Sequence, residues 1–206
     1  MNKIIATLTV AGVFAASSAL AVQPVTTALT LSNVIGDGSN GSYWTLGWSF
    51  SVNSQIDVTA LGVYDSGQDG LTEDHAVGLW DASGNLLAST IVPAGGGTLD
   101  NYFMFVPING VVLDPGNYVV GARMEDEAYN PYSGTVPSVT TPPEITYLNG
   151  LYIKSGGLDF PTELSNGGYF GGDFQFEPVP EPSQIEFGAL MLIGATGYAI
   201  RRRLAK

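Results

Sequence analysis

The chain contains no cysteine, which excludes a disulfide framework, a cysteine nucleophile and cysteine-based metal sites. Cations are also scarce in Val22–Pro178, where Arg123 and Lys154 are the only basic residues among seventeen acidic ones. The resulting net charge of −15 repels nucleic acid and anionic lipid, so neither is expected as a partner of this segment. Such acidity ordinarily serves solvation, and capture of divalent cations is the alternative.

Histidine is nearly absent as well, because His75 is the only one in the chain. A Ser-His-Asp triad would have to use His75, yet no G-x-S-x-G motif accompanies it. A histidine-rich zinc site is excluded by the count. We therefore expect a non-enzymatic protein. A glycoside hydrolase remains the less favoured alternative, because paired carboxylates about 5–9.5 Å apart cannot be recognised from a sequence.

The first residues have the layout of a secretory signal peptide. Lys3 provides the positive charge, Ile4–Ala16 is apolar, and the small residues Ala19 and Ala21 form a cleavage pattern. We expect cleavage after Ala21, which makes Val22 the mature N-terminus and residues 1–21 a signal peptide. A retained N-terminal anchor is the alternative.

The end of the chain combines three features in a fixed order. The tripeptide Pro180-Glu181-Pro182 comes first, the uncharged run Phe187–Ile200 follows, and a cationic cluster ends the chain with Arg201, Arg202, Arg203 and Lys206. A helix over that run spans roughly 21 Å, against a hydrocarbon core of about 30 Å. The cations would hold its end on the cytoplasmic side of a membrane. The run is thus marginal as a permanent span.

This layout resembles the PEP-CTERM sorting signal of Gram-negative bacteria. The resemblance implies Sec-dependent export, an inner-membrane intermediate, processing by a membrane-embedded exosortase, and delivery to the cell surface or extracellular matrix. It also implies an association with exopolysaccharide and biofilm. An ordinary C-terminal membrane anchor is the alternative. A Gram-positive sortase signal is not indicated, because the chain has no LPxTG motif.

The segment between the two signals predicts an all-β fold. Short β-forming stretches alternate with Gly- and Pro-containing turns, which is typical of a sandwich. In Tyr43–Phe50, Trp44, Leu46, Trp48 and Phe50 share one face by strict alternation. An apolar face at period two is a core face, so both tryptophans are interpreted as packing residues and not as sugar-binding platforms.

Turn signals divide the remainder into further strands. The turn Asp81–Asn85 predicts a hairpin, and Tyr118–Met124 is expected to be a central strand. The other predicted strands are Ala28–Val34, Ile56–Asp65, Tyr102–Val106, Val111–Leu113, Ile145–Ile153 and Tyr169–Phe176.

The order of strands over residues 28–124 resembles the β-sandwich domain often found ahead of PEP-CTERM tails, which is similar to jelly-roll carbohydrate-binding modules. We therefore expect a single jelly-roll-like antiparallel β-sandwich over residues 22–177. A signal-peptide helix would precede it, and the sorting tail with a short hydrophobic helix would occupy residues 178–206. The resemblance brings no catalytic residue with it.

The loop Asp65–Asp74 is chemically suggestive, because Asp65, Asp69, Glu73 and Asp74 could supply oxygen ligands to Ca²⁺. It departs from an EF-hand loop, in which a bidentate Glu would stand where Ala76 stands here. A solvated turn is therefore the favoured interpretation, and Ca²⁺ is the only candidate cofactor.

A Pro-rich excursion follows Met124. Its aromatic residues Tyr129 and Tyr132 could stack on a sugar ring, and Glu125 and Asp126 could accept hydrogen bonds from its hydroxyl groups. These four residues are the candidate contacts for a carbohydrate-binding module, and a Ca²⁺-dependent module is one form of this alternative. The alternative is a loop that packs its own tyrosines.

Overall fold

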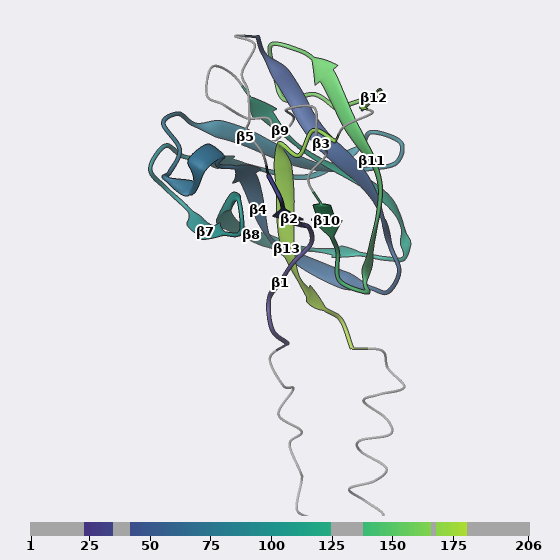
Figure 1. Ribbon diagram of the computed structural model, residues 1–206. Coiled ribbons are helices and arrows are strands. Elements are labelled where there is room, and N and C mark those ends of the chain that lie inside the picture. Colours follow the sequence, from purple (N-terminus) through teal and green to yellow (C-terminus); the bar gives the residue numbers. More distant parts are fainter. Residues whose placement is uncertain (1–22, 35–41, 125–137, 166–167, 181–206) are drawn as a thin grey trace, which may run out of the picture. The chain divides into compact units, whose positions relative to one another are not determined.

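The computed structural model describes residues 23–34, 42–124, 138–165 and 168–180 (Figure 1). They belong to one compact unit, Gln23–Pro182. Within these ranges, no helix reaches the length and apolarity that crossing a membrane requires. The predicted signal-peptide helix and the predicted C-terminal helix lie outside the described residues.

The described chain forms two antiparallel sheets that face each other, plus a small two-stranded ladder. The first sheet has the order β1 (Thr26–Thr27), β13 (Gly172–Pro178), β4 (Ile56–Tyr64), β8 (Phe103–Leu113) and β7 (Thr98–Asp100). The second has the order β12 (Glu163–Ser165), β11 (Ile145–Lys154), β3 (Trp44–Val52), β9 (Gly116–Met124), β5 (His75–Asp81) and β6 (Leu86–Val92). The ladder pairs β2 (Thr30–Ser32) with β10 (Ser138–Thr140), and a 3₁₀ turn covers Ser66–Gln68. Because the chain passes repeatedly from one sheet to the other, the all-β sandwich is confirmed.

Aromatic side chains join the two sheets in the core. Trp48 of β3 stacks on Phe174 of β13 with ring centroids 5.9 Å apart, and Phe50 lies 4.8 Å from Phe174. The indole Nε1–H of Trp48 donates a 2.8 Å hydrogen bond to the carbonyl oxygen of Gly172. Trp44 is half-buried and packs against the same cluster. The interpretation of both tryptophans as packing residues is therefore confirmed.

The hairpin and the central strand were also predicted correctly. β5 and β6 pair through the turn at residues 82–85, where Gly84 adopts a φ of 86°. The Asp81 carboxylate closes this turn by accepting hydrogen bonds from the amides of Ser83 and Asn85 at 2.8 and 2.9 Å. β9 lies between β3 and β5, inside the second sheet.

Two strand predictions differ from the structure in their bounds. The stretches 102–106 and 111–113 are one strand, β8, because a bulge lets the chain pass Pro107 without losing its pairing. Ala60 of β4 is paired with Pro107, whereas Val58, two residues away, is paired with Val111. The predicted strand 28–34 is longer than the observed one, because only Thr30–Ser32 within it forms a strand, β2, while the separate strand β1 precedes it and pairs with a different partner.

Candidate functional site

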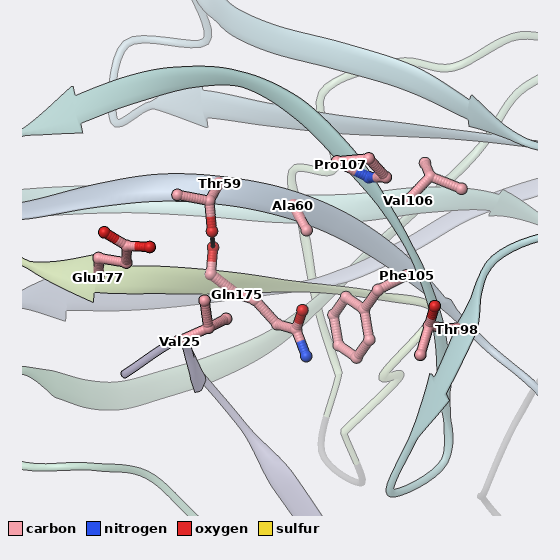
Figure 2. Close-up of a pocket in the computed structure, with 9 residues that line it drawn as sticks. All are labelled: Val25, Thr59, Ala60, Thr98, Phe105, Val106, Pro107, Gln175 and Glu177. Atoms are coloured by element: carbon pink, nitrogen blue, oxygen red, sulfur yellow. Dashed lines mark hydrogen bonds between the residues drawn. The ribbon is translucent and has the colours of Figure 1, made fainter. Parts of the chain in front are cut away.

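An open groove lies on the face of the first sheet that is turned away from the second sheet. Gln175 and Glu177 of β13 point there, since they alternate with the core residues Phe174 and Phe176. The groove encloses about 520 Å³. Its lining, drawn in Figure 2, consists of Val25, Thr59, Ala60, Thr98, Phe105, Val106, Pro107, Gln175 and Glu177.

The apolar part of the groove depends on a glycine. Phe105 of β8 is paired with Gly62 of β4, and its ring occupies the space that a side chain at position 62 would need. A Cβ atom at Gly62 would lie only 2.5 Å from the Phe105 ring carbon Cδ1. The missing side chain thus lets Phe105 lie flat on the sheet, where it is 97% buried and forms one end of the groove floor.

The polar part of the groove centres on Gln175. Figure 2 shows its side chain reaching toward Phe105, between Glu177 at one end of the groove and Thr98 at the other. The amide Nε2–H₂ donates to Thr27 Oγ1 at 3.1 Å and to Asp100 Oδ2 at 3.3 Å. Thr27 Oγ1 in turn donates a short hydrogen bond to Asp100 Oδ2. Three strands, β1, β7 and β13, therefore bring a hydroxyl, a carboxylate and an amide together.

Asp173 lies two residues before Gln175, on the same face of β13, and is fully buried. Neither of its carboxyl oxygens meets hydrogen-bond geometry. Burial raises the pKa of Asp173 well above its ordinary value; the nearby backbone amides of Phe174 and Leu29 oppose this shift and the charge of Asp100 adds to it. Burial outweighs the amides, so the carboxyl group is neutral in the folded protein at pH values where other aspartates are ionised.

The predicted calcium loop does not bring its carboxylates together. Asp65 is buried and accepts a hydrogen bond from the Gly70 amide at 3.0 Å, whereas Asp74 is exposed and accepts one from the Ala94 amide at 2.8 Å. Asp69 is exposed, and Glu73 Oε1 lies 4.0 Å from His75 Nε2. Among the described residues, no group of three or more His, Cys, Asp or Glu side chains is placed to hold a metal ion. The loop is therefore built from separate turn contacts.

His75 is the first residue of β5 and is buried. Its Nδ1 lies 3.0 Å from the carbonyl oxygen of Arg123. This contact ties the start of β5 to β9, which gives the only histidine a structural position.

Several predicted site residues lie outside the described residues. They are the cleavage residues Ala19, Ala21 and Val22, the glycan candidates Glu125, Asp126, Tyr129 and Tyr132, and the tail residues Glu181, Pro182, Arg201, Arg202 and Arg203. Pro180 is described and exposed. It follows β13 closely, since the amide of Val179 still donates to the carbonyl oxygen of Gln55 at 3.0 Å.

A family model described as a domain of unknown function, DUF4082, matches residues 32–171. The chain belongs to the DUF4082 family. No curated protein and no solved structure matches the chain. The DUF4082 match begins within β2 and ends before β13, so it includes Asp100 and most of the groove but neither Thr27 nor Gln175.

The sequence did not reveal Asp100, Asp173 or Gln175 as site residues. The alternation in Gly172–Phe176 does place Asp173 and Gln175 on the face opposite the phenylalanines. Their convergence with Thr27 depends on the pairing of the first and last strands, 148 residues apart. That pairing leaves no local signal in the chain.

Proposed function

We propose that this DUF4082 protein is an exported, exosortase-sorted protein of the cell surface or extracellular matrix, associated with exopolysaccharide and without enzymatic activity. The N-terminal signal peptide would direct it to Sec, and the tail from Pro180 onward would direct it to exosortase in the envelope. Processing would then remove the hydrophobic run of the tail. The β-sandwich is the folded part that remains.

One structural observation supports this proposal. β1 and β13 are antiparallel neighbours, with Thr26 paired to Phe176. The chain therefore enters and leaves the domain at the same end of the first sheet. Such a domain can fold while the segments before and after it are both held at a membrane, because neither segment has to cross the sandwich.

Intact-mass analysis of the native protein tests the sorting proposal. In cells with active exosortase, the mature protein should begin near Val22 and should lack the cluster Arg201–Arg203. In cells without exosortase, the tail should be retained and the protein should stay in the membrane fraction. Recovery of an unprocessed tail from exosortase-positive cells would refute the proposal.

The groove favours carbohydrate binding as a second function. It places the carboxylate of Glu177, the hydroxyl groups of Thr59 and Thr98, and an apolar floor at Phe105 along one open surface. Sugars offer both hydroxyl groups and apolar ring faces, so they match a site of this mixed kind. This site is distinct from Tyr129 and Tyr132.

Retention on immobilised exopolysaccharide of the producing organism tests this second function. Glu177→Gln should weaken retention, since it removes a charged acceptor within the groove, whereas Glu163→Gln on the exposed edge strand β12 should not. A loss caused by Tyr132→Ala and not by Glu177→Gln would instead favour the Pro-rich excursion. Equal retention of all variants would exclude both surfaces.

A further inference from the structure

The contacts around Gln175 bring together three groups that can react with each other. Thr27 of β1 and Gln175 of β13 are direct cross-strand partners, and the hydroxyl of Thr27 is 3.1 Å from the amide nitrogen of Gln175. The same hydroxyl donates to Asp100 Oδ2. The hydroxyl group of Thr27 thus lies between a carboxylate, which can act as its base, and the amide nitrogen that is bonded to the electrophilic carbon Cδ of Gln175.

We propose that Thr27 and Gln175 form an intramolecular ester bond, with Asp100 as the general base, and that this bond covalently joins the first and last strands of the domain. The inference does not depend on the sorting tail, because the reacting groups all lie within the sandwich.

The reaction is an exchange of an amide for an ester. Asp100 takes the hydroxyl proton as Thr27 Oγ1 attacks the carbonyl carbon Cδ of Gln175, and a bond forms between Oγ1 and Cδ. The bond between Cδ and Nε2 then breaks, and the proton passes from Asp100 to the departing nitrogen, which leaves as ammonia. Nothing is oxidised or reduced, and no further reactant is needed.

The strand pairing supplies the proximity that this reaction needs. Direct cross-strand partners have Cβ atoms about 4.5–5.5 Å apart, so two side chains of this length meet without distortion. Holding a nucleophile beside its electrophile turns a slow bimolecular reaction into an efficient intramolecular one. Because the pairing of β1 with β13 holds the two side chains together, the reaction needs no separate enzyme.

Asp173 makes the surroundings suitable for the developing oxyanion. It is buried beside Gln175 on the same face of β13, and burial raises its pKa and so favours the neutral form of its carboxyl group. An ionised Asp173 would add a second negative charge next to that of Asp100 and would oppose the negative charge that builds on the Gln175 oxygen. A neutral carboxylic acid is in addition a proton donor.

The groove provides an exit for the product. Gln175 lines the open groove, so ammonia released there reaches solvent directly (Figure 2). In water at neutral pH it becomes ammonium, which is not a nucleophile, and the reverse reaction is thereby suppressed. The ester would stabilise the first and last strands of a domain that has no cysteine for a disulfide.

The distribution of basic residues gives a direct test with the full-length chain. Arg123 and Lys154 are the only trypsin sites between Thr27 and Gln175, so complete digestion of the denatured protein places these two residues in separate fragments. If the ester exists, the two fragments remain joined, and their combined mass is lower than the sum by one ammonia. Hydroxylamine at mildly alkaline pH should then separate them.

Matched variants assign the bond to its residues. Thr27→Val keeps the shape but removes the hydroxyl and should abolish the joined fragment, whereas Thr26→Val, at the neighbouring position of β1, should leave it unchanged. Thr27→Ser should retain it, and Asp100→Asn should slow its appearance at least tenfold. The folded state of each variant is checked by thermal unfolding followed by circular dichroism.

The joined fragment, and not the loss of ammonia alone, is the decisive result. Succinimide formation at Asn109-Gly110 would also release ammonia, but it would not connect the two fragments. Separate fragments from folded wild-type protein would refute the ester and leave Thr27, Asp100 and Gln175 as a hydrogen-bonded cluster. A joined fragment in Thr27→Val would refute the assignment to Thr27.

Discussion

The two faces of β13 carry different side chains, although each face contains fully buried residues. Phe174 and Phe176 face the second sheet and are fully buried among aromatic rings, whereas Asp173 and Gln175 face the other way. Asp173 is as completely buried as Phe174, yet neither of its oxygens has good hydrogen-bond geometry. Burial alone therefore does not define the core of this sandwich. The inner face of β13 carries packed rings, and its outer face carries polar groups, of which Gln175 belongs to a hydrogen-bonded cluster.

Truncation of a core ring should have the largest effect. Phe174→Ala removes a ring that contacts both Trp48 and Phe50, and it should lower the free energy of unfolding by about 3–5 kcal/mol. Val112→Ala on the same sheet is the control, because Val112 is 57% exposed and should change stability by no more than about 0.5 kcal/mol. Urea denaturation measures both. Similar losses of stability for the two variants would show that the inner and outer faces of the first sheet contribute equally to stability.

A smaller loss of stability is expected when a side chain is added beneath the Phe105 ring. Gly62→Ala places a methyl group against the Phe105 ring, and displacing that ring should destabilise the protein by about 1–3 kcal/mol. Combining Gly62→Ala with Phe105→Leu should cost less than the sum of the single variants, because the smaller side chain makes room for the methyl group. Additive losses measured by urea denaturation would show that the two positions do not interact.

The inner face was predictable from the sequence, and the reason is its periodicity. Trp44, Leu46, Trp48 and Phe50 alternate with small or polar residues, so their side chains must share a face whatever strands lie beside them. The same reasoning failed at Pro107. A proline normally ends a strand, and only the bulge in the pairing of β8 with β4 lets the strand continue.

The outer face was not predictable, because its groups come from distant parts of the chain. Thr27, Asp100 and Gln175 look like ordinary polar residues of short strands, and only their long-range pairing makes them a cluster. The acidic loop Asp65–Asp74 shows the opposite case. Its local density of carboxylates suggested a site, yet Asp65 and Asp74 accept hydrogen bonds from different parts of the backbone.

The pH dependence of stability should distinguish the buried carboxyl group from exposed ones. Burial raises the folded-state pKa of Asp173 above its ordinary value of 3.8, so the folded protein binds more protons than the unfolded chain between these two pKa values. Its contribution to stability is therefore complete below about pH 3.8 and is lost as the pH rises through the raised pKa.

Asp173→Asn should remove this contribution, so the unfolding free energy of the variant should fall less with rising pH than that of the wild type. Urea titrations between pH 4 and pH 9 measure the two slopes. Val112→Ala is the control, because it removes no titratable group and should leave the wild-type slope unchanged. Parallel slopes for wild type and Asp173→Asn would show that Asp173 does not titrate differently in the two states.

The smallest change in the free energy of unfolding is expected near the C-terminal end of β13. Asp57 of β4 and Glu177 of β13 are direct cross-strand partners, and like charges in that position repel each other. Asp57→Asn should therefore stabilise the protein by about 0.2–1 kcal/mol, and the gain should shrink in 1 M salt, where the screening length is about 3 Å. A gain that persists in high salt would instead point to Asp57 Oδ1, which is buried without a hydrogen bond, as the source of the cost.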